Sequence, residues 1–224
     1  MLRHFFLILC LGCFAQFALA LDTISMVGCE DLNFVHKEKI LPRGSALITS
    51  SGKLKDQGIV AIIHAGMASR DNRNDEPYNP TIKSLQDSII NSLILAERFQ
   101  YKRIAVPFMG GGVFFKNLKT DQDELAYIIV KTAYEHANGS ELVFLSIDQD
   151  QVDSFRVAAR RVNSPSISVV KGSITDFKVH RASAIVNSAN MEMRFGTGLS
   201  GAIAKATGKK KEIDEEAKKM ILSL

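Results

Sequence analysis

The chain has 224 residues, of which 46% are hydrophobic and 23% charged, with 15 glycines and five prolines. This ordinary globular composition excludes a disordered chain, a collagen-like chain and a coiled coil, and the length suits one domain or two small ones. The net charge of +4 creates no large basic field, so the charge carries no strong signal for nucleic acid.

The first 20 residues have the pattern of a secretory signal peptide. A short basic start, Arg3-His4, precedes an uncharged run over 5–20 that ends in the small-x-small sequence Ala18-Leu19-Ala20. The run is short for a transmembrane helix, so we expect no membrane span once the leader is cleaved. We therefore predict an exported protein, periplasmic or secreted, or an effector that acts in another cell. The alternatives are that this segment is retained as a membrane anchor, or that the start of the sequence is misassigned.

Cysteine and histidine usage argues against disulfides and metal sites. Two of the three cysteines, Cys10 and Cys13, would leave with the leader, and Cys29 alone cannot form an internal disulfide. The five histidines are scattered, and no Cys/His cluster has zinc spacing. We expect neither a metal ion nor a cofactor, and we expect the fold to be stabilised by its hydrophobic core.

Strands and helices alternate along the rest of the chain. Apolar runs rich in β-branched residues, such as GIVAIIH over 58–64, are typical of strands covered on both faces. Apolar positions at three-to-four spacing, as from Ile82 to Ala96, are typical of amphipathic helices. Strands are predicted over 45–49, 58–64, 103–107, 141–147, 167–170 and 182–187, and helices over 81–98, 121–136, 152–161 and from 202 onward. This order predicts an α/β fold, a three-layer α/β/α sandwich with a mixed sheet.

Two glycine-rich loops follow strands and precede helices, at the sheet edge where α/β folds bind ligands. Gly110-Gly111-Gly112 can approach a ligand closely and form an anion-binding nest of backbone amides, or it is a flexible turn. The second loop, over 196–201, opens a helix, where backbone amides favour phosphate. Asn187 and Asn190 end the strand before it and offer amide groups to sugar hydroxyls. Alternatively, Asn187 caps loop backbone and Asn190 begins a turn.

The C-terminal motifs resemble a known family. VVKGSIT over 169–175, AIVNSAN over 184–190, GLSGAI over 198–203 and ATG over 206–208 are similar to the opening half of a macrodomain. Macrodomains are α/β/α modules that bind ADP-ribose. The asparagine-containing strand end is the most specific of these signals.

The closing half of the family is also present, but earlier in the chain. RGSALIT over 43–49, IIH over 62–64, IAVP over 104–107 and GGGVF over 110–114 resemble it. The resemblance therefore implies a circularly permuted macrodomain over 21–224, with its closing half at 28–162 and its opening half at 167–220. The break over 163–166 would join the old ends, and the charge-dense segment 209–219 would lie next to 27–43. Permutation costs little where chain ends lie close together at the surface. Two incomplete macrodomains are the rival, but neither half would bury a full sheet.

The resemblance also implies the binding residues. Ser173 and Ile174 would border adenine, the two glycine loops would hold the diphosphate from both sides, and Asn190 and Phe114 would contact the distal ribose. The residues expected to bind ADP-ribose are Ser173, Ile174, Asn187, Asn190, Gly196, Gly198, Leu199, Ser200, Gly110, Gly111, Gly112, Val113 and Phe114.

Two positions depart from the family pattern. Ser173 stands where the family commonly has an Asp that bonds the adenine amine, so adenine recognition is weakened or passes to Asp176. Ser200 stands where many hydrolytic members have an Asp, and serine without a partner is a poor base. Asn190 and Ser200 are the catalytic candidates. A substitute carboxylate could come from Asp71, Asp75, Glu76 or Glu192, although each can equally be a solvated loop charge.

Three functions follow from these residues. The first is a hydrolase that removes ADP-ribose from modified targets, for which a carboxylate near the distal ribose would help. The second, favoured by Ser173 and Ser200, is a non-catalytic reader of ADP-ribose. The third is a binder of another nucleotide phosphate, or a structural remnant. The expected partner is ADP-ribose or an ADP-ribosylated protein, and the expected state is a monomer.

Overall fold

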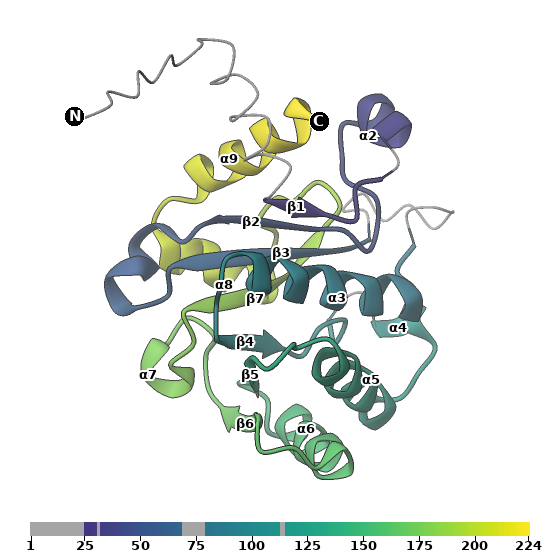
Figure 1. The fold of residues 1–224 in the computed structure, drawn as a ribbon, viewed down its shortest axis with the longest axis vertical. Coiled ribbons are helices and arrows are strands. Elements are labelled where there is room, and N and C mark those ends of the chain that lie inside the picture. Colours follow the sequence, from purple (N-terminus) through teal and green to yellow (C-terminus); the bar gives the residue numbers. More distant parts are fainter. Residues whose placement is uncertain (1–24, 31, 69–78, 113–114) are drawn as a thin grey trace, which may run out of the picture.

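The computed structural model describes residues 25–30, 32–68, 79–112 and 115–224 (Figure 1). The predicted signal peptide, residues 1–20, lies outside the described residues. Within the described part, no helix combines the length and the apolar character needed to span a bilayer.

In the described part of the chain, seven strands form one mixed sheet in the order β1-β2-β3-β7-β4-β5-β6. The strands are β1 (Met26–Val27), β2 (Ala46–Ser50), β3 (Ala61–Ala68), β4 (Arg103–Pro107), β5 (Glu141–Ser146), β6 (Ile167–Lys171) and β7 (Ala184–Asn190). The β1–β2 and β2–β3 pairs are antiparallel, and the other pairs are parallel. All eight residues of β3 are buried, as its continuous apolar run predicts for a strand covered on both faces.

Helices cover both faces of the sheet, which confirms the predicted three-layer α/β/α sandwich (Figure 1). The helices are α2 (Leu32–Glu38), α3 (Ile82–Arg98), α4 (Phe115–Leu118), α5 (Gln122–Glu135), α6 (Gln149–Val162), α7 (Phe177–His180), α8 (Gly198–Thr207) and α9 (Lys210–Ser223), with a 3-10 helix over Gly52–Gln57. One core packs α3, α5 and α6 against the sheet through side chains such as Leu85, Ile129 and Phe155. A second core on the opposite face contains Phe195, Ile203 of α8 and Ile213 of α9.

The N-terminal and C-terminal parts of the chain interleave in this sheet. β7 lies between β3 and β4 and is parallel to both, with Ile185 opposite Ile62 on one side and Ala105 on the other. The segment 163–166 leads from α6 into β6, which pairs with β5. The centre of the sheet therefore needs residues from both parts of the chain.

The last helix packs beside the first described residues, as the sequence predicts for segments 209–219 and 27–43. Ala217 and Ile221 of α9 share a buried cluster with Val35 of α2 and Leu41. Ser50 also donates its amide and hydroxyl to the two carboxylate oxygens of Glu216 at 3.0 and 2.7 Å. In Figure 1, α9 lies on the same side of the molecule as β1 and β2.

The structure corrects the predicted elements in three places. The helix predicted from 202 onward is two helices, because Gly208 adopts a left-handed conformation (φ 60°) that ends α8. β3 and β7 begin and end a few residues later than predicted, since their last residues still pair with each other, Ala68 opposite Asn190. The short elements β1, α2, α4 and α7 carry too few residues for a periodic signal, so the sequence did not predict them.

Candidate functional site

The carboxyl ends of the parallel strands surround one cavity of about 440 Å³. Its walls come from the loops after β4, β5 and β6 and from the first turn of α8. The residues that line it are Pro107, Phe108, Gly111, Gly112, Leu145, Ser146, Ile147, Gln151, Gly172, Ser173, Ile174, Gly198, Leu199 and Ala202. The sequence predicted a ligand site at this edge, and the two glycine loops do face one cavity.

The glycine loops leave backbone open at one end of the cavity. A β-carbon on Gly112 or Gly198, which line the cavity, or on the neighbouring Gly196, which does not, would meet no atom of the described residues within 4 Å. Neither Gly112 nor Gly196 has a positive φ, so packing and backbone conformation do not explain why these two positions lack a side chain. Gly110 differs, because it has φ 77° and its β-carbon would come within 2.7 Å of Leu118.

The first turn of α8 offers amide groups at the same end. Thr197 holds the N-cap position but its side chain makes no capping hydrogen bond. The positive end of the helix dipole and its uncapped amides therefore face the loop that lines the cavity, an arrangement that favours an anion. No arginine or lysine is among the described lining residues, so the groups that these residues offer to an anion are uncharged donors such as backbone amides.

The other end of the cavity is mainly apolar. Leu145, Ile174 and Ile147 line it, and Ile147 is 75% exposed although it follows a buried strand. Apolar walls of this kind suit a flat aromatic ring rather than a charged group.

Ser173 at this end is engaged with its own loop. Its Oγ lies 2.9 Å from Thr175 Oγ1 and accepts from the Thr175 amide at 3.3 Å. Asp176 accepts from the Lys178 amide and caps α7, so this carboxylate serves the helix start. His180 anchors the same loop, with Nε2 3.0 Å from the Ile174 carbonyl and Nδ1 accepting from the Ala182 amide. Burial lowers the pKa of His180.

A chain of buried polar side chains runs beneath the second glycine loop. Thr49 Oγ1 lies 2.9 Å from Nε2 of His64, and Nδ1 of His64 lies 3.2 Å from Nδ2 of Asn187. Asn187 Nδ2 also donates to Ser200 Oγ at 3.3 Å, and that hydroxyl accepts from the Gly196 amide at 3.2 Å. The chain therefore connects β2, β3 and β7 to the loop that precedes α8.

Burial governs the electrostatics of this chain. His64 is fully buried, which lowers its pKa to about 3, so its imidazole is neutral at physiological pH. Asn187 Oδ1 has no hydrogen-bond partner among the described residues. Asn187 and Ser200 thus support the loop from behind, and neither lines the cavity.

Asn190 also supports a loop rather than lining the cavity. Its Nδ2 donates to the Arg194 carbonyl at 2.9 Å, and its Oδ1 accepts from the Arg194 amide at 3.1 Å. Both ends of the amide are therefore bonded to the backbone of the turn that follows β7. This geometry matches the alternative in which Asn190 organises a turn.

Carboxylates lie away from the cavity walls within the described residues. Asp214 of α9 accepts from the Phe195 amide at 2.9 Å and so holds the chain next to Gly196. Glu192 is in the same turn as Asn190 and outside the cavity lining. The other acids considered from the sequence, Asp71, Asp75 and Glu76, lie outside the described residues. The same is true of Val113 and Phe114.

The structure thus divides the predicted binding residues into two sets. Ser173, Ile174, Gly111, Gly112, Gly198 and Leu199 line the cavity, whereas Asn187, Asn190, Gly110, Gly196 and Ser200 do not. Sequence reasoning missed the lining residues Phe108, Ser146, Ile147 and Gln151. Phe108 and Ile147 directly follow β4 and β5, Ser146 ends β5 and Gln151 lies in the first turn of α6, so their place at the carboxyl ends of parallel strands is the signal that could have found them.

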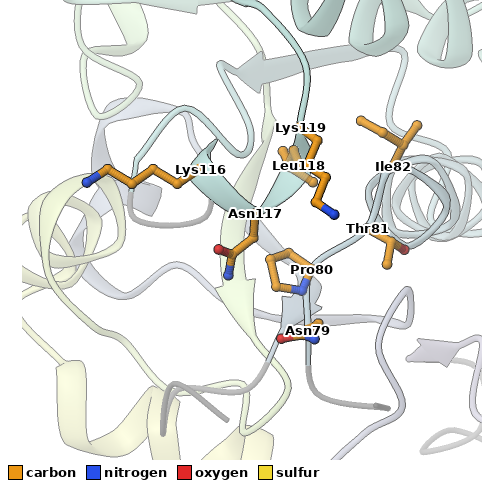
Figure 2. Close-up of a pocket in the computed structure, with 8 residues that line it drawn as sticks. All are labelled: Asn79, Pro80, Thr81, Ile82, Lys116, Asn117, Leu118 and Lys119. Carbon is orange, nitrogen blue, oxygen red and sulfur yellow. The ribbon is translucent and has the colours of Figure 1, made fainter. Parts of the chain in front are cut away.

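A second hollow of about 570 Å³ lies between the start of α3 and α4 (Figure 2). Its walls include Pro80, Thr81 and Asn117, and the side chain of Lys116 extends away from Pro80. The first turn of α3 is already capped there, because Thr81 accepts from the Ser84 amide and Ser84 accepts from the Thr81 amide. Two amides at this helix start are therefore occupied by side chains, which differs from the uncapped start of α8 at the glycine loops.

No group of three or more histidines, cysteines or acids in the described part of the chain is placed to hold a metal ion. Cys29 is partly buried, and burial raises the pKa of its thiol to about 12, so it is protonated and unreactive at neutral pH.

Residues 28–121 match the family model of the Macro domain, and no curated protein matches the chain. The matched stretch runs from the residue after β1 to Asp121, which caps α5. It includes Gly110-Gly111-Gly112 and most of the segment that resembles the closing half of a macrodomain. The family that this stretch matches binds ADP-ribose.

Proposed function

We propose that the chain is a circularly permuted macrodomain that binds ADP-ribose through the cavity at the two glycine loops. One observation carries this proposal: Gly112, from the segment that resembles the closing half, and Gly198, from the segment that resembles the opening half, line the same cavity, and a β-carbon on either would meet no atom of the described residues within 4 Å. Glycine at such positions lets a diphosphate approach the backbone amides.

The permutation and the single-domain boundaries, 21–224, are supported by the sheet. The motifs that resemble the opening half lie in 167–220, after the segment 28–162 that resembles the closing half and contains the family match over 28–121, and this order supports the permutation. β7 of the second half fills the gap between β3 and β4 of the first. Two separate incomplete domains would each leave a central strand edge unpaired, which is costly.

The arrangement of the cavity favours one orientation of the ligand. The diphosphate would lie between Gly111-Gly112 and the first turn of α8, where amides are available. Adenine would lie at the apolar end, against Ile147 and Ile174. This orientation agrees with the resemblance for Ser173 and Ile174, and it leaves the distal ribose toward the turn that Asn190 organises.

Binding without turnover is the function that the geometry supports better. None of the described residues that line the cavity is an acid, and Ser200 is occupied by Asn187 and the Gly196 amide. Without a base next to it, this hydroxyl does not become a nucleophile. We therefore place the reader function ahead of hydrolysis of ADP-ribosyl linkages.

Calorimetric titration of ADP-ribose into the full chain tests the proposal. Gly112→Ala is the sharpest variant, because it strains no backbone and meets no described atom, and so should leave the free energy of unfolding unchanged. The added methyl group would keep the phosphate away from the backbone amide at this position. Loss of that one contact to a charged phosphate should raise the Kd about ten- to a hundredfold. Gly110→Ala is the contrasting control, since it should lower stability through its positive φ and Leu118.

Two results would contradict the proposal. Folded wild-type protein that gives no heat with ADP-ribose would show that the two halves do not rebuild the site. Equal affinity of wild type and Gly112→Ala would place binding elsewhere. Titration with ADP and AMP distinguishes a general nucleotide phosphate binder, which would bind them as tightly as ADP-ribose.

A release assay separates the reader from the hydrolase. Wild-type protein is incubated with an ADP-ribosylated protein, and free ADP-ribose is measured over time. A reader binds the modified protein and releases nothing. Release that exceeds the rate without protein, and that is lost in Asn190→Ala or Ser200→Ala while ADP-ribose still binds, would establish the hydrolase instead.

We further propose that the protein is exported after cleavage behind Ala20 and is a monomer. The basic start, the uncharged run and the small-x-small end over 1–20 support the leader. Mass spectrometry of protein from its native source should find an N-terminus at Leu21. Protein that retains Met1 in the cytosol would refute export, and light scattering measures the oligomeric state.

A further inference from the structure

We propose that the side-chain NH2 of Gln151 donates a hydrogen bond to the diphosphate of the bound nucleotide. Gln151 lies in the first turn of α6 and lines the cavity, and neither the resemblance nor the family match assigns it a role. The inference rests on the proposed function, and it adds one specific side-chain donor to the backbone amides of the two glycine loops.

The side chain of Gln151 reaches the first glycine loop. A β-carbon on Gly111 would come within 3.1 Å of Nε2 of Gln151, so this nitrogen lies directly against the loop backbone. Both residues line the cavity. The proposed orientation of the ligand puts the diphosphate between this loop and the first turn of α8. Nε2 therefore lies beside the place that the diphosphate would occupy.

Ser146 fixes which end of the Gln151 amide is left for a ligand. Ser146 Oγ accepts from the Asp148 amide at 3.1 Å and lies 2.7 Å from Gln151 Oε1. Because the serine already accepts from Asp148, its own proton is directed at Oε1. The backbone of Gln151 is held too, since its amide bonds Asp148 Oδ1 at 3.3 Å. With Oε1 occupied, the NH2 group is the free end of the side chain.

Nε2 of Gln151 is the one side-chain N–H donor among the described residues that line the cavity. Two of these residues carry hydroxyls, and both are engaged, Ser146 with Gln151 and Ser173 with Thr175. The hydrogen bonds of the Gln151 side chain within the described residues use Oε1 and leave Nε2 without an acceptor. A donor that a second side chain orients, and that has no acceptor at a cavity wall, is prepared to bind a ligand.

The diphosphate is the part of the ligand that suits this donor. Its oxygens are charged acceptors, and hydrogen bonds to a charged acceptor are stronger than those between neutral groups. The carboxylate at the start of α6, Asp148, accepts from the Asp150 and Gln151 amides and is not among the lining residues. The start of α6 therefore presents a neutral donor to the cavity, not a negative charge.

Substitutions of opposite charge test this contact, with ADP-ribose titrated calorimetrically into the full chain. Gln151→Lys keeps a donor for the diphosphate but loses the acceptor for Ser146. Gln151→Glu keeps that acceptor but replaces the donor with a negative oxygen. A contact with the diphosphate therefore predicts tighter binding by Gln151→Lys, whereas a purely structural role, which depends on the bond with Ser146, predicts tighter binding by Gln151→Glu.

Gln149→Lys and Gln149→Glu are the matched controls. They put the same charges at an exposed position of the same helical turn, outside the cavity lining. Gln151→Glu should raise the Kd about ten- to a hundredfold, because a hydrogen bond to a charged group is replaced by repulsion. Gln151→Lys should bind at least as tightly as wild type. The ratio of the Kd of the glutamate variant to that of the lysine variant should be at least about tenfold larger at position 151 than at position 149.

The outcomes separate this inference from the proposed function. If wild type binds ADP-ribose but the two ratios are equal, Gln151 does not contact the diphosphate and the inference fails alone. Tighter binding by Gln151→Glu than by Gln151→Lys overturns it in the same way. Adenosine, which has no phosphate, should have the same Kd for wild type and Gln151→Glu in an NMR titration, and a tenfold difference would place Gln151 at the nucleoside instead. If folded wild type does not bind ADP-ribose, the nucleotide site itself fails, and the inference falls with it.

Discussion

The buried imidazole of His64 should make the stability of the fold depend on pH. His64 lies between Thr49 and Asn187 with no exposed surface, and burial lowers its pKa from the ordinary 6.5 to about 3. In the unfolded chain the imidazole returns to water and regains its ordinary pKa. The unfolded state therefore binds a proton more readily than the folded state, and acid favours unfolding.

The sign and size of the effect follow from these two values. Above pH 6.5 the imidazole is neutral in both states, and its contribution to stability is complete. As the pH falls from 6.5 toward 3, the unfolded chain takes up a proton that the folded chain excludes. Relative to pH 8, the free energy of unfolding at pH 5 should fall by about 2 kcal/mol from His64 alone.

Urea unfolding at pH 8 and pH 5 measures this difference. His64→Gln removes the titrating group and leaves an amide that can still bond Thr49, so its loss between the two pH values should be about 2 kcal/mol smaller than that of wild type. His36→Gln, at an exposed position of α2, removes one histidine without touching the core and should behave as wild type. If His64→Gln folds at pH 8 and loses as much stability as wild type, the reasoning is refuted.

Three further results are expected. Asn190→Ala should lower the free energy of unfolding by about 1–2 kcal/mol, because the Arg194 amide and carbonyl lose their partner; unchanged urea unfolding would contradict this role. Phe155→Ala should lower the free energy of unfolding by about 3–5 kcal/mol, because the ring is fully buried and packs on Phe108 and Phe144 at centroid distances of 5.0 and 5.3 Å. Thermal or urea unfolding measures this loss. A chain truncated after Val162 lacks β7 and should show no cooperative unfolding transition; a sharp transition would mean that the first part folds alone.

The main strands and helices could be predicted from the sequence because each is buried either on both faces or on one side. β3 and β4 are covered on both faces, so each appears as a continuous apolar run. α3 is covered on one side, so its apolar residues recur with the helical period. The glycine loops after β4 and before α8 were predicted at the correct edge, because parallel strands bring their carboxyl ends together.

The roles of single polar side chains could not be predicted in the same way. Asn190 turns its amide onto Arg194, and Ser200 turns its hydroxyl onto Gly196, and both contacts depend on the local path of the backbone. His64 is 123 residues from Asn187 in the chain, so their contact exists only in the assembled sheet. Gln151 became visible as a lining residue only when the loop after β5 was placed beside Gly111.

The position of β7 also determines the order in which the protein can fold. A ribosome releases β3 and β4 well before residues 184–190, and these two strands cannot pair with each other because the missing strand belongs between them. Until it arrives, two central strand edges have unsatisfied backbone groups, which is a state prone to aggregation. Closure of the sheet then depends on contacts between residues far apart in the chain, which slows folding. The nascent protein is therefore expected to depend on chaperones until its C-terminal third has been made.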